Sequence, residues 1–156
     1  MDDRNIVRLN NLDEAALVSL AQRFGAAIKQ GGLIYLIGDL GAGKTTFARA
    51  MIKAFGVAER IKSPTYSLIE SYRSATLSIH HLDLYRIADP GELEWLGLAD
   101  LVTPDALLLV EWPERAGHAL PPADLQIRLS HAGLRRNLVV DTSTAMGKSW
   151  MQDAAF

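Results

Sequence analysis

Three features are missing from this 156-residue sequence, and each absence excludes a class of protein. There is no cysteine, which excludes disulfides, thiolate zinc sites and cysteine nucleophiles and fits a reducing compartment. No apolar run approaches the roughly 20 residues that a membrane-spanning helix needs. Residues 1–5 lack the long apolar core of a signal peptide. We therefore expect a cytoplasmic protein with no membrane contact.

A strong charge of either sign is also missing. Sixteen Lys and Arg residues stand against eighteen Asp and Glu residues, which gives a net charge of −2. Broad binding to a nucleic acid backbone requires an excess of positive charge, so we expect any RNA to contact a partner instead. The length, with 49% hydrophobic and 22% charged residues, fits one globular domain with a proper core.

The most informative feature present is a complete phosphate-binding loop of the form G-x-x-x-x-G-K-[ST]. It spans residues 38–45 and reads GDLGAGKT. Its glycines allow backbone N–H groups to close around phosphate oxygens, Lys44 neutralises the terminal phosphates, and the Thr45 hydroxyl ligates Mg²⁺. The apolar run 33–37 precedes the loop, and the helical pattern of 46–55 follows it. This order of strand, loop and helix predicts a nucleoside triphosphate site rather than a chance match.

The rest of the pattern predicts an α/β protein. We expect a three-layer fold of the P-loop NTPase type, with a mostly parallel central sheet, an antiparallel hairpin and flanking helices. Residues 1–142 form its single domain, and residues 143–156 are expected to be a loosely held tail. Further expected strands cover 6–9, 66–72, 77–83, 106–111, 125–129 and 137–141. Expected helices begin after a cap at Asn11 or Asp13 and near residue 92.

Three polar residues are candidates for the chemistry at the phosphates. Glu111 ends a continuous apolar run, which is the pattern of a strand buried on both faces. We favour a role for Glu111 as a ligand near the metal over a solvated position where the strand leaves the sheet. Asp83 either orients the attacking water or holds a metal-bound water, or it caps a turn or pairs with Arg86. Thr65 either closes over the γ-phosphate or simply begins a strand after Pro64.

Other conspicuous side chains receive structural interpretations. His80 and His81 are neighbours on a strand and point to opposite faces, so they cannot chelate a metal together and are interpreted as packed or solvated. Trp112 could stack on a partner or a nucleotide, but packing is the usual role of such an aromatic. Arg135 and Arg136 are interpreted as a solvated turn. The guanine-reading motifs N-K-x-D and T-K-x-D are missing, so ATP is favoured over GTP.

Four motifs in order resemble the bacterial TsaE (YjeE) family of small ATPases. They are GDLGAGKTTF at 38–47, SPTYSL at 63–68, HLDLYR at 81–86 and EWPE at 111–114, and the resemblance covers about residues 5–141. It implies a weak ATPase needed for the N6-threonylcarbamoyladenosine modification at position 37 of tRNAs that read codons starting with A. It also implies TsaD and TsaB as partners, with tRNA bound indirectly through the complex, while TsaC supplies threonylcarbamoyl-adenylate.

The same resemblance implies roles for individual residues. Hydrolysis would depend on Lys44, Asp83 and Thr65, with Thr65 in a switch-like loop, and Mg²⁺ would be held by Thr45 and Glu111. Trp112 would lie next to the metal site, and further nucleotide contacts would lie near Glu14 and Gly133. The ATP phosphates would be held by Leu40, Gly41, Ala42, Gly43, Lys44 and Thr45.

Two other functional classes compete with this interpretation. A small-metabolite kinase shares the size, the sheet and the phosphate loop. Such a kinase usually carries an arginine-bearing lid and an acceptor site soon after the loop helix, where this chain has SPTY and a hairpin. A nucleotide-gated binding module without useful turnover is the third class.

Overall fold

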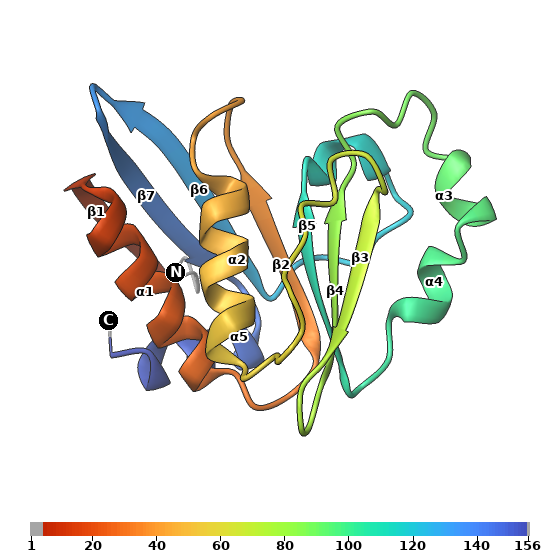
Figure 1. Cartoon of the computed structure of the whole chain (residues 1–156), viewed down its shortest axis with the longest axis horizontal. Helices are drawn as coiled ribbons and strands as arrows, with labels where there is room; N and C mark the ends of the chain where they lie inside the picture. Colours follow the sequence, from red (N-terminus) through yellow and green to blue (C-terminus); the bar gives the residue numbers. More distant parts are fainter. Residues whose placement is uncertain (1–4, 156) are drawn as a thin grey trace.

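Seven strands form one mixed sheet in the computed structural model, which describes residues 5–155. The strands are β1 (Asn5–Leu12), β2 (Gly32–Ile37), β3 (Ile69–Arg73), β4 (Ser78–Asp83), β5 (Ala106–Glu111), β6 (Leu125–Ala132) and β7 (Arg135–Thr142). The helices are α1 (Glu14–Ala27), α2 (Lys44–Ala54), α3 (Glu92–Trp95), α4 (Leu98–Leu101), the 3-10 helix η1 (Pro113–Ala116) and α5 (Ala145–Asp153) (Figure 1). The strand order in space is β1-β7-β6-β2-β5-β4-β3.

The centre of the sheet is parallel and its two flanks are antiparallel. β6, β2, β5 and β4 run parallel to one another, whereas β3 pairs antiparallel with β4, and β7 pairs antiparallel with both β6 and β1. The expected α/β class with a parallel core and flanking helices is confirmed. The antiparallel part is larger than the single expected hairpin. Only Gly133 and Leu134 join β6 to β7, and so short a turn can connect only antiparallel strands.

The parallel core brings three strand ends to one edge of the sheet. β2 ends at Ile37 directly before the phosphate loop, and β4 and β5 end at Asp83 and Glu111. In the register of the sheet, Glu111 lies opposite Leu36 on one side and Asp83 on the other. Because the carboxyl ends of parallel strands meet at the same edge, two acids from distant parts of the sequence lie beside the loop.

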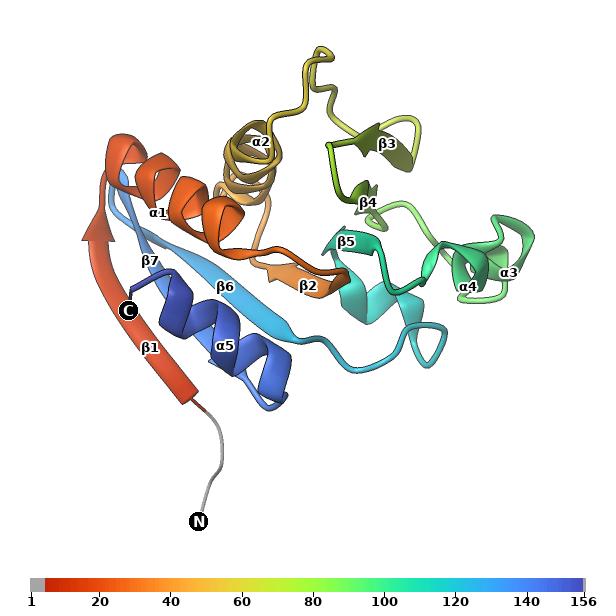
Figure 2. The same cartoon turned by 90° about the horizontal axis from the view of Figure 1, so that it is seen from below.

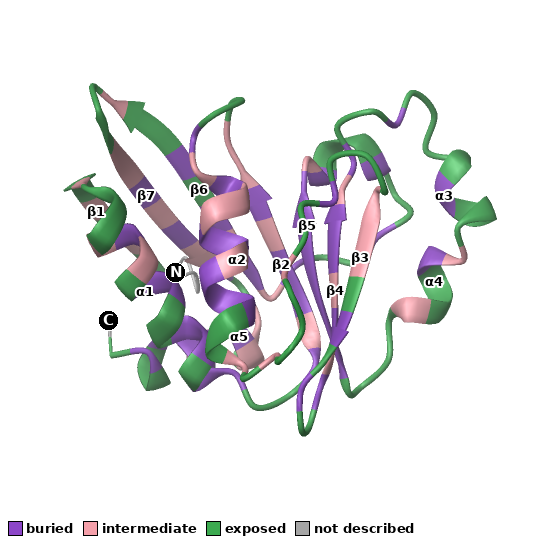
Figure 3. Cartoon of the chain, in the orientation of Figure 1, coloured by how far each residue is buried: buried purple, intermediate pink, exposed green. Residues whose placement is uncertain are grey.

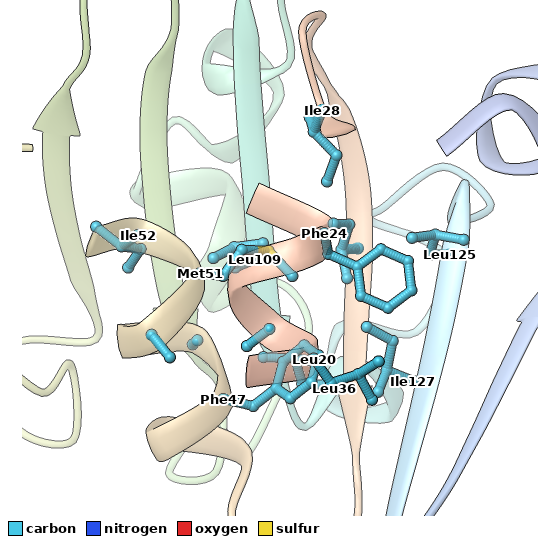
Figure 4. Close-up of a cluster of buried hydrophobic side chains, with 14 of the residues drawn as sticks. Leu20, Phe24, Ile28, Leu36, Phe47, Met51, Ile52, Leu109, Leu125 and Ile127 are labelled. Carbon is cyan, nitrogen blue, oxygen red and sulfur yellow. The ribbon is translucent and has the colours of Figure 1, made fainter. Parts of the chain in front are cut away.

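Both faces of the parallel core are covered, which gives three layers (Figure 2). One face carries α1 and α2, whose apolar side chains pack on alternate residues of the central strands (Figure 4). On the other face, alternate residues of β2, β4 and β5 pack with residues of α3, α4 and η1. β5 is buried along its whole length, as its unbroken apolar run predicted (Figure 3). This central strand therefore holds Glu111 in a rigid position.

The end of the chain differs from the expectation of a loosely held tail. α5 begins at the cap Thr144, whose side chain accepts a hydrogen bond from the Gly147 N–H. Trp150 and Met151 are each 3% exposed and join the core formed by α1 and α2. Arg23 of α1 also donates hydrogen bonds to the backbone carbonyls of Ala154 and Ala155, at 3.1 and 2.9 Å. Thr144 thus begins a helix, because short polar side chains cap helix N-termini.

At the other end of the sequence, Asp13 rather than Asn11 caps α1. The Asp13 side chain accepts a hydrogen bond from the Ala16 N–H, while Asn11 lies in an irregular part of β1 with φ of 60°. None of the described helices is long and apolar enough to cross a membrane.

Candidate nucleotide-binding site

The phosphate loop occupies the turn between β2 and α2. Gly43 has φ of 104°, a left-handed conformation that a side chain rarely adopts, and it is the residue from which α2 begins. A Cβ atom on Gly38 would collide with the carbonyl oxygen of Leu129. Both positions therefore require glycine. The loop ends at the N-terminus of an 11-residue helix, where unpaired N–H groups and the helix dipole favour an anion.

Arg136 holds this loop from the far end of the sequence. Its guanidinium donates hydrogen bonds to the Gly41 carbonyl at 3.0 Å and to the Ala42 carbonyl at 3.1 Å. These two carbonyls point toward β7. A planar guanidinium fits two neighbouring acceptors, which fixes the loop backbone more tightly than one bond would. The expected solvated turn is therefore wrong for Arg136.

A cavity of about 330 Å³ opens at the edge of the sheet where the loop and the two acids meet. Most of the residues singled out from the sequence line it. The lining consists of Leu40, Gly41, Gly43, Lys44, Thr45, Thr46, Thr65, Asp83, Tyr85, Arg86, Glu111 and Trp112. Ala42, also a residue of the loop, is fully buried and does not line this cavity. The sequence motifs at 38–45, 63–68, 81–86 and 111–114 thus converge on one space.

Thr45 and Glu111 lie in contact within this cavity. The Thr45 hydroxyl donates to the Glu111 carboxylate, with distances of 3.0 and 3.1 Å to its two oxygens. Glu111 is 2% exposed, so the position is not the solvated strand exit that was the alternative. Its carboxylate also lies 2.7 Å from Nε2 of the buried His81. His80, on the opposite face of β4, contacts the Ser71 hydroxyl instead.

Lys44 is held against neutral partners. Its ammonium group donates a hydrogen bond to the Gly38 carbonyl and lies 3.8 Å from the centroid of the Trp112 ring. Burial lowers the pKa of Lys44, and the carboxylates of Glu111 and Asp83 oppose this shift. A phosphate entering the cavity would supply the negative charge that this partly desolvated ammonium lacks.

Asp83 lies beside Glu111 at the end of β4. Its carboxylate accepts a hydrogen bond from the Tyr85 N–H at 3.1 Å, so it does cap the turn that follows. Burial raises the pKa of Asp83, and the charge of Glu111 acts in the same direction. Arg86 packs over the Tyr66 ring at 4.8 Å. Asp83 thus combines the turn-capping role with a position in the cavity, where an acid of raised pKa can accept a proton from water.

Thr65 lies in an exposed turn at the mouth of the cavity. This turn is closed by a hydrogen bond from the Leu68 N–H to the Pro64 carbonyl at 2.9 Å, and β3 begins only at Ile69. The alternative of a threonine that starts a strand is therefore wrong. The Thr65 hydroxyl contacts the hydroxyl of Ser63, two residues away, at 2.7 Å.

A second, smaller cavity of about 180 Å³ adjoins the other side of the loop. It is lined by Glu14 with Leu12, Leu17, Gly41, Gly43, Thr46, Leu134 and Arg136. Gly133 lies in the β6–β7 turn with φ of 64° and lines neither cavity. Leu134 and Arg136, which follow it in the chain, line the smaller cavity. A space next to the phosphate loop that is lined by both apolar and charged side chains suits the base or ribose of a nucleotide.

The donor set fits a magnesium nucleotide. Mg²⁺ prefers oxygen ligands, binds few protein groups and keeps its remaining positions for water and phosphate. The Thr45 hydroxyl and the Glu111 carboxylate supply two such oxygen ligands next to an anion-binding loop. No group of three or more His, Cys, Asp or Glu side chains suited to a metal occurs within residues 5–155.

Sequence reasoning missed two residues of this site, His81 and Arg136. Both make their contacts across the sheet to partners 30 or more positions away. For His81, the one available signal was the alternation of side chains along β4. It places one of the two adjacent histidines on the sheet face that also carries Glu111.

Comparison with known proteins shows the family to which the chain is similar. The model of the family "Threonylcarbamoyl adenosine biosynthesis protein TsaE" matches residues 11–138. The protein of Haemophilus influenzae named "tRNA threonylcarbamoyladenosine biosynthesis protein TsaE" is 38% identical over 142 residues, covering 88% of this chain and 90% of that protein. The Bacillus subtilis protein of the same name is 36% identical over 132 residues, covering 85% and 81%.

A solved structure shows the same fold. The crystal structure of YdiB from Bacillus subtilis superposes with a TM-score of 0.75 and 26% sequence identity, and the match covers 97% of this chain and 94% of that one. The family model spans the phosphate loop, both acids and the strands that position them. On these matches, the chain belongs to the TsaE family.

Proposed function

We propose that this protein binds and hydrolyses ATP with Mg²⁺, and that its nucleotide state supports the formation of N6-threonylcarbamoyladenosine at position 37 of tRNA. It would act through a complex with TsaD and TsaB, and the complex rather than this chain would hold the tRNA. The contact between Thr45 and Glu111 at the end of a complete phosphate loop carries the proposal. The names of the relatives from Haemophilus influenzae and Bacillus subtilis support the role in this tRNA modification.

Each residue has a defined task in this proposal. The loop amides and Lys44 bind the β- and γ-phosphates, and Thr45 and Glu111 hold the metal, which supplies charge neutralisation at the phosphates when bound. Asp83 accepts a hydrogen bond from the attacking water and orients it. Thr65 closes over the γ-phosphate from the exposed turn. The smaller cavity near Glu14 receives the adenosine.

Phosphate release from ATP tests the proposal. The purified protein is incubated with Mg²⁺ and ATP, alone and together with TsaB and TsaD. We expect slow release by the protein alone and faster release in the presence of both partners. Phosphoryl transfer to a metabolite without these partners would support a small-metabolite kinase instead. Nucleotide binding without turnover in either mixture would support a binding module.

A further inference from the structure

A buried histidine lies directly behind the proposed magnesium ligand. The side chains of His81 and Glu111 are only 1% and 3% exposed, and Nε2 lies 2.7 Å from Oε2. A carboxylate oxygen accepts hydrogen bonds, so Nε2 carries the hydrogen and donates it. The Thr45 hydroxyl approaches the same carboxylate from the loop. Hydrogen bonds from two elements therefore hold Glu111 in one orientation.

The strand register explains why His81 meets this acid. His81 lies opposite Leu109 in the pairing of β4 with β5, and Glu111 is two residues further along β5. Side chains two apart on a strand share a face, so His81 and Glu111 lie diagonally on the same face of the sheet. His80 occupies the other face. The contact is therefore built by the sheet rather than by a flexible loop.

His81 acts on the site only through Glu111. It does not line the cavity at the phosphate loop, so a nucleotide there would not touch it. Its Nδ1 atom is buried and makes no hydrogen bond within residues 5–155, which leaves the contact with Glu111 as the one that offsets the burial of the ring. An aliphatic side chain would fill this place at lower desolvation cost. The polar ring thus has a purpose other than packing.

We propose that His81 is a positioning residue whose Nε2–H fixes the Glu111 carboxylate toward Thr45 and thereby sets the affinity of the site for Mg²⁺. The inference rests on the proposed nucleotide function. Mg²⁺ demands near-ideal octahedral geometry, so a ligand that is already oriented binds it better than one that must lose rotamer freedom. Loss of such outer partners of metal ligands lowers metal affinity by about 10- to 100-fold.

The test measures Mg²⁺ affinity rather than turnover. ADP binding is followed by calorimetry across a series of Mg²⁺ concentrations and once in EDTA, and direct Mn²⁺ binding is followed by electron paramagnetic resonance. We expect His81→Leu and His81→Asn to need about tenfold more Mg²⁺, since neither places a donor where Nε2 lies. His81→Gln, whose amide can reach that place, should retain most of the metal affinity. ADP binding in EDTA should stay unchanged in all three variants.

His80→Leu is the matched control and should leave the Mg²⁺ requirement unchanged. If His81→Leu fails to fold, the comparison of His81→Asn with His81→Gln decides. A wild-type Mg²⁺ requirement in His81→Asn, or a loss in His81→Gln as large as in His81→Asn, would overturn the inference. A wild-type protein that binds no ADP at any Mg²⁺ concentration contradicts the proposed function itself, which is a separate and recognisable outcome.

Discussion

The ammonium nitrogen of Lys44 lies 3.8 Å from the centroid of the Trp112 ring, which follows the proposed metal ligand directly in the sequence. Lys44 is 5% exposed and also donates a hydrogen bond to the Gly38 carbonyl. The lysine is thus held at the phosphate site by an aromatic face and a backbone dipole. These partners compensate a desolvated ammonium only in part, since its pKa is lowered by burial.

Replacing Lys44 should separate activity from stability. We expect Lys44→Ala to lower ATP hydrolysis by more than about 100-fold, because a preorganised cation at the phosphates is lost. The melting temperature without nucleotide should stay the same or rise, since a partly desolvated charge is removed. Phosphate release and thermal unfolding measure the two effects. Lys53→Ala, an exposed position on the same helix, is the control, and wild-type hydrolysis in Lys44→Ala would contradict the assignment.

The pKa of Asp83 predicts a pH-dependent gain of stability in Asp83→Asn. Burial raises the pKa of Asp83 in the folded protein, because it disfavours the charged carboxylate. The contribution of the protonated Asp83 to the free energy of unfolding is fully present below the unfolded pKa of about 3.9. It is lost as the pH rises through the folded pKa and the buried carboxylate becomes charged. At pH 7 the variant should therefore melt at a higher temperature than the wild type, although it hydrolyses ATP more slowly. The difference in melting temperature should shrink toward pH 4.

The control for this experiment is Asp100→Asn, at an exposed position of α4, which should show no comparable gain at pH 7. An Asp83→Asn variant that is less stable than the wild type at pH 7 would show that the hydrogen bond to the Tyr85 N–H outweighs the cost of burial.

Arg136 offers a test of how the loop is held. Arg136→Ala removes the donors to the Gly41 and Ala42 carbonyls, and each such bond contributes about 1.5–3 kcal/mol to stability. Only part of this free energy stabilises the loop conformation that would bind a nucleotide. We therefore expect the ADP dissociation constant, measured by calorimetry, to rise about tenfold. The neighbouring Arg135→Ala should change it little. Equal dissociation constants for Arg136→Ala and the wild type would show that the loop keeps its shape unaided.

The C-terminal helix should contribute to stability but not to binding. Trp150 is almost fully buried in the core, and its replacement by Ala leaves a cavity, so we expect Trp150→Ala to lower the free energy of unfolding by about 3–5 kcal/mol in urea titrations. Gln152→Ala, at an exposed position on the same helix, should change it by less than about 0.5 kcal/mol. An unchanged free energy of unfolding in Trp150→Ala would show that α5 does not stabilise the fold and is a loosely held tail.

The parts of the site that the sequence predicted are those with local causes. The phosphate loop is defined by residues that are consecutive, so its place between a strand and a helix could be predicted before any tertiary contact was known. Glu111 was recognisable because an unbroken apolar run before it indicates a strand buried on both faces. Asp83 and Thr65 could be named as candidates, yet their alternatives stayed open until the sheet placed them.

The parts that sequence could not predict depend on strand order. β2 lies between β6 and β5, both of which come much later in the chain, so nothing local indicates that Arg136 reaches the loop. The contact of His81 with Glu111 depends in the same way on the register of β4 against β5. The helix after Thr144 was missed for another reason. Its buried apolar residues belong to the core that α1 and α2 cover, and a helix of only nine residues is stabilised mainly by such tertiary packing.

The brace that β7 provides to the phosphate loop has a consequence during synthesis of the protein. A ribosome that has translated only as far as α2 has made the entire phosphate loop. Arg136, which donates hydrogen bonds to the Gly41 and Ala42 carbonyls, comes more than 90 residues after them. If the chain binds nucleotide as proposed, we expect the nascent chain to bind it more tightly once β7 has joined the sheet.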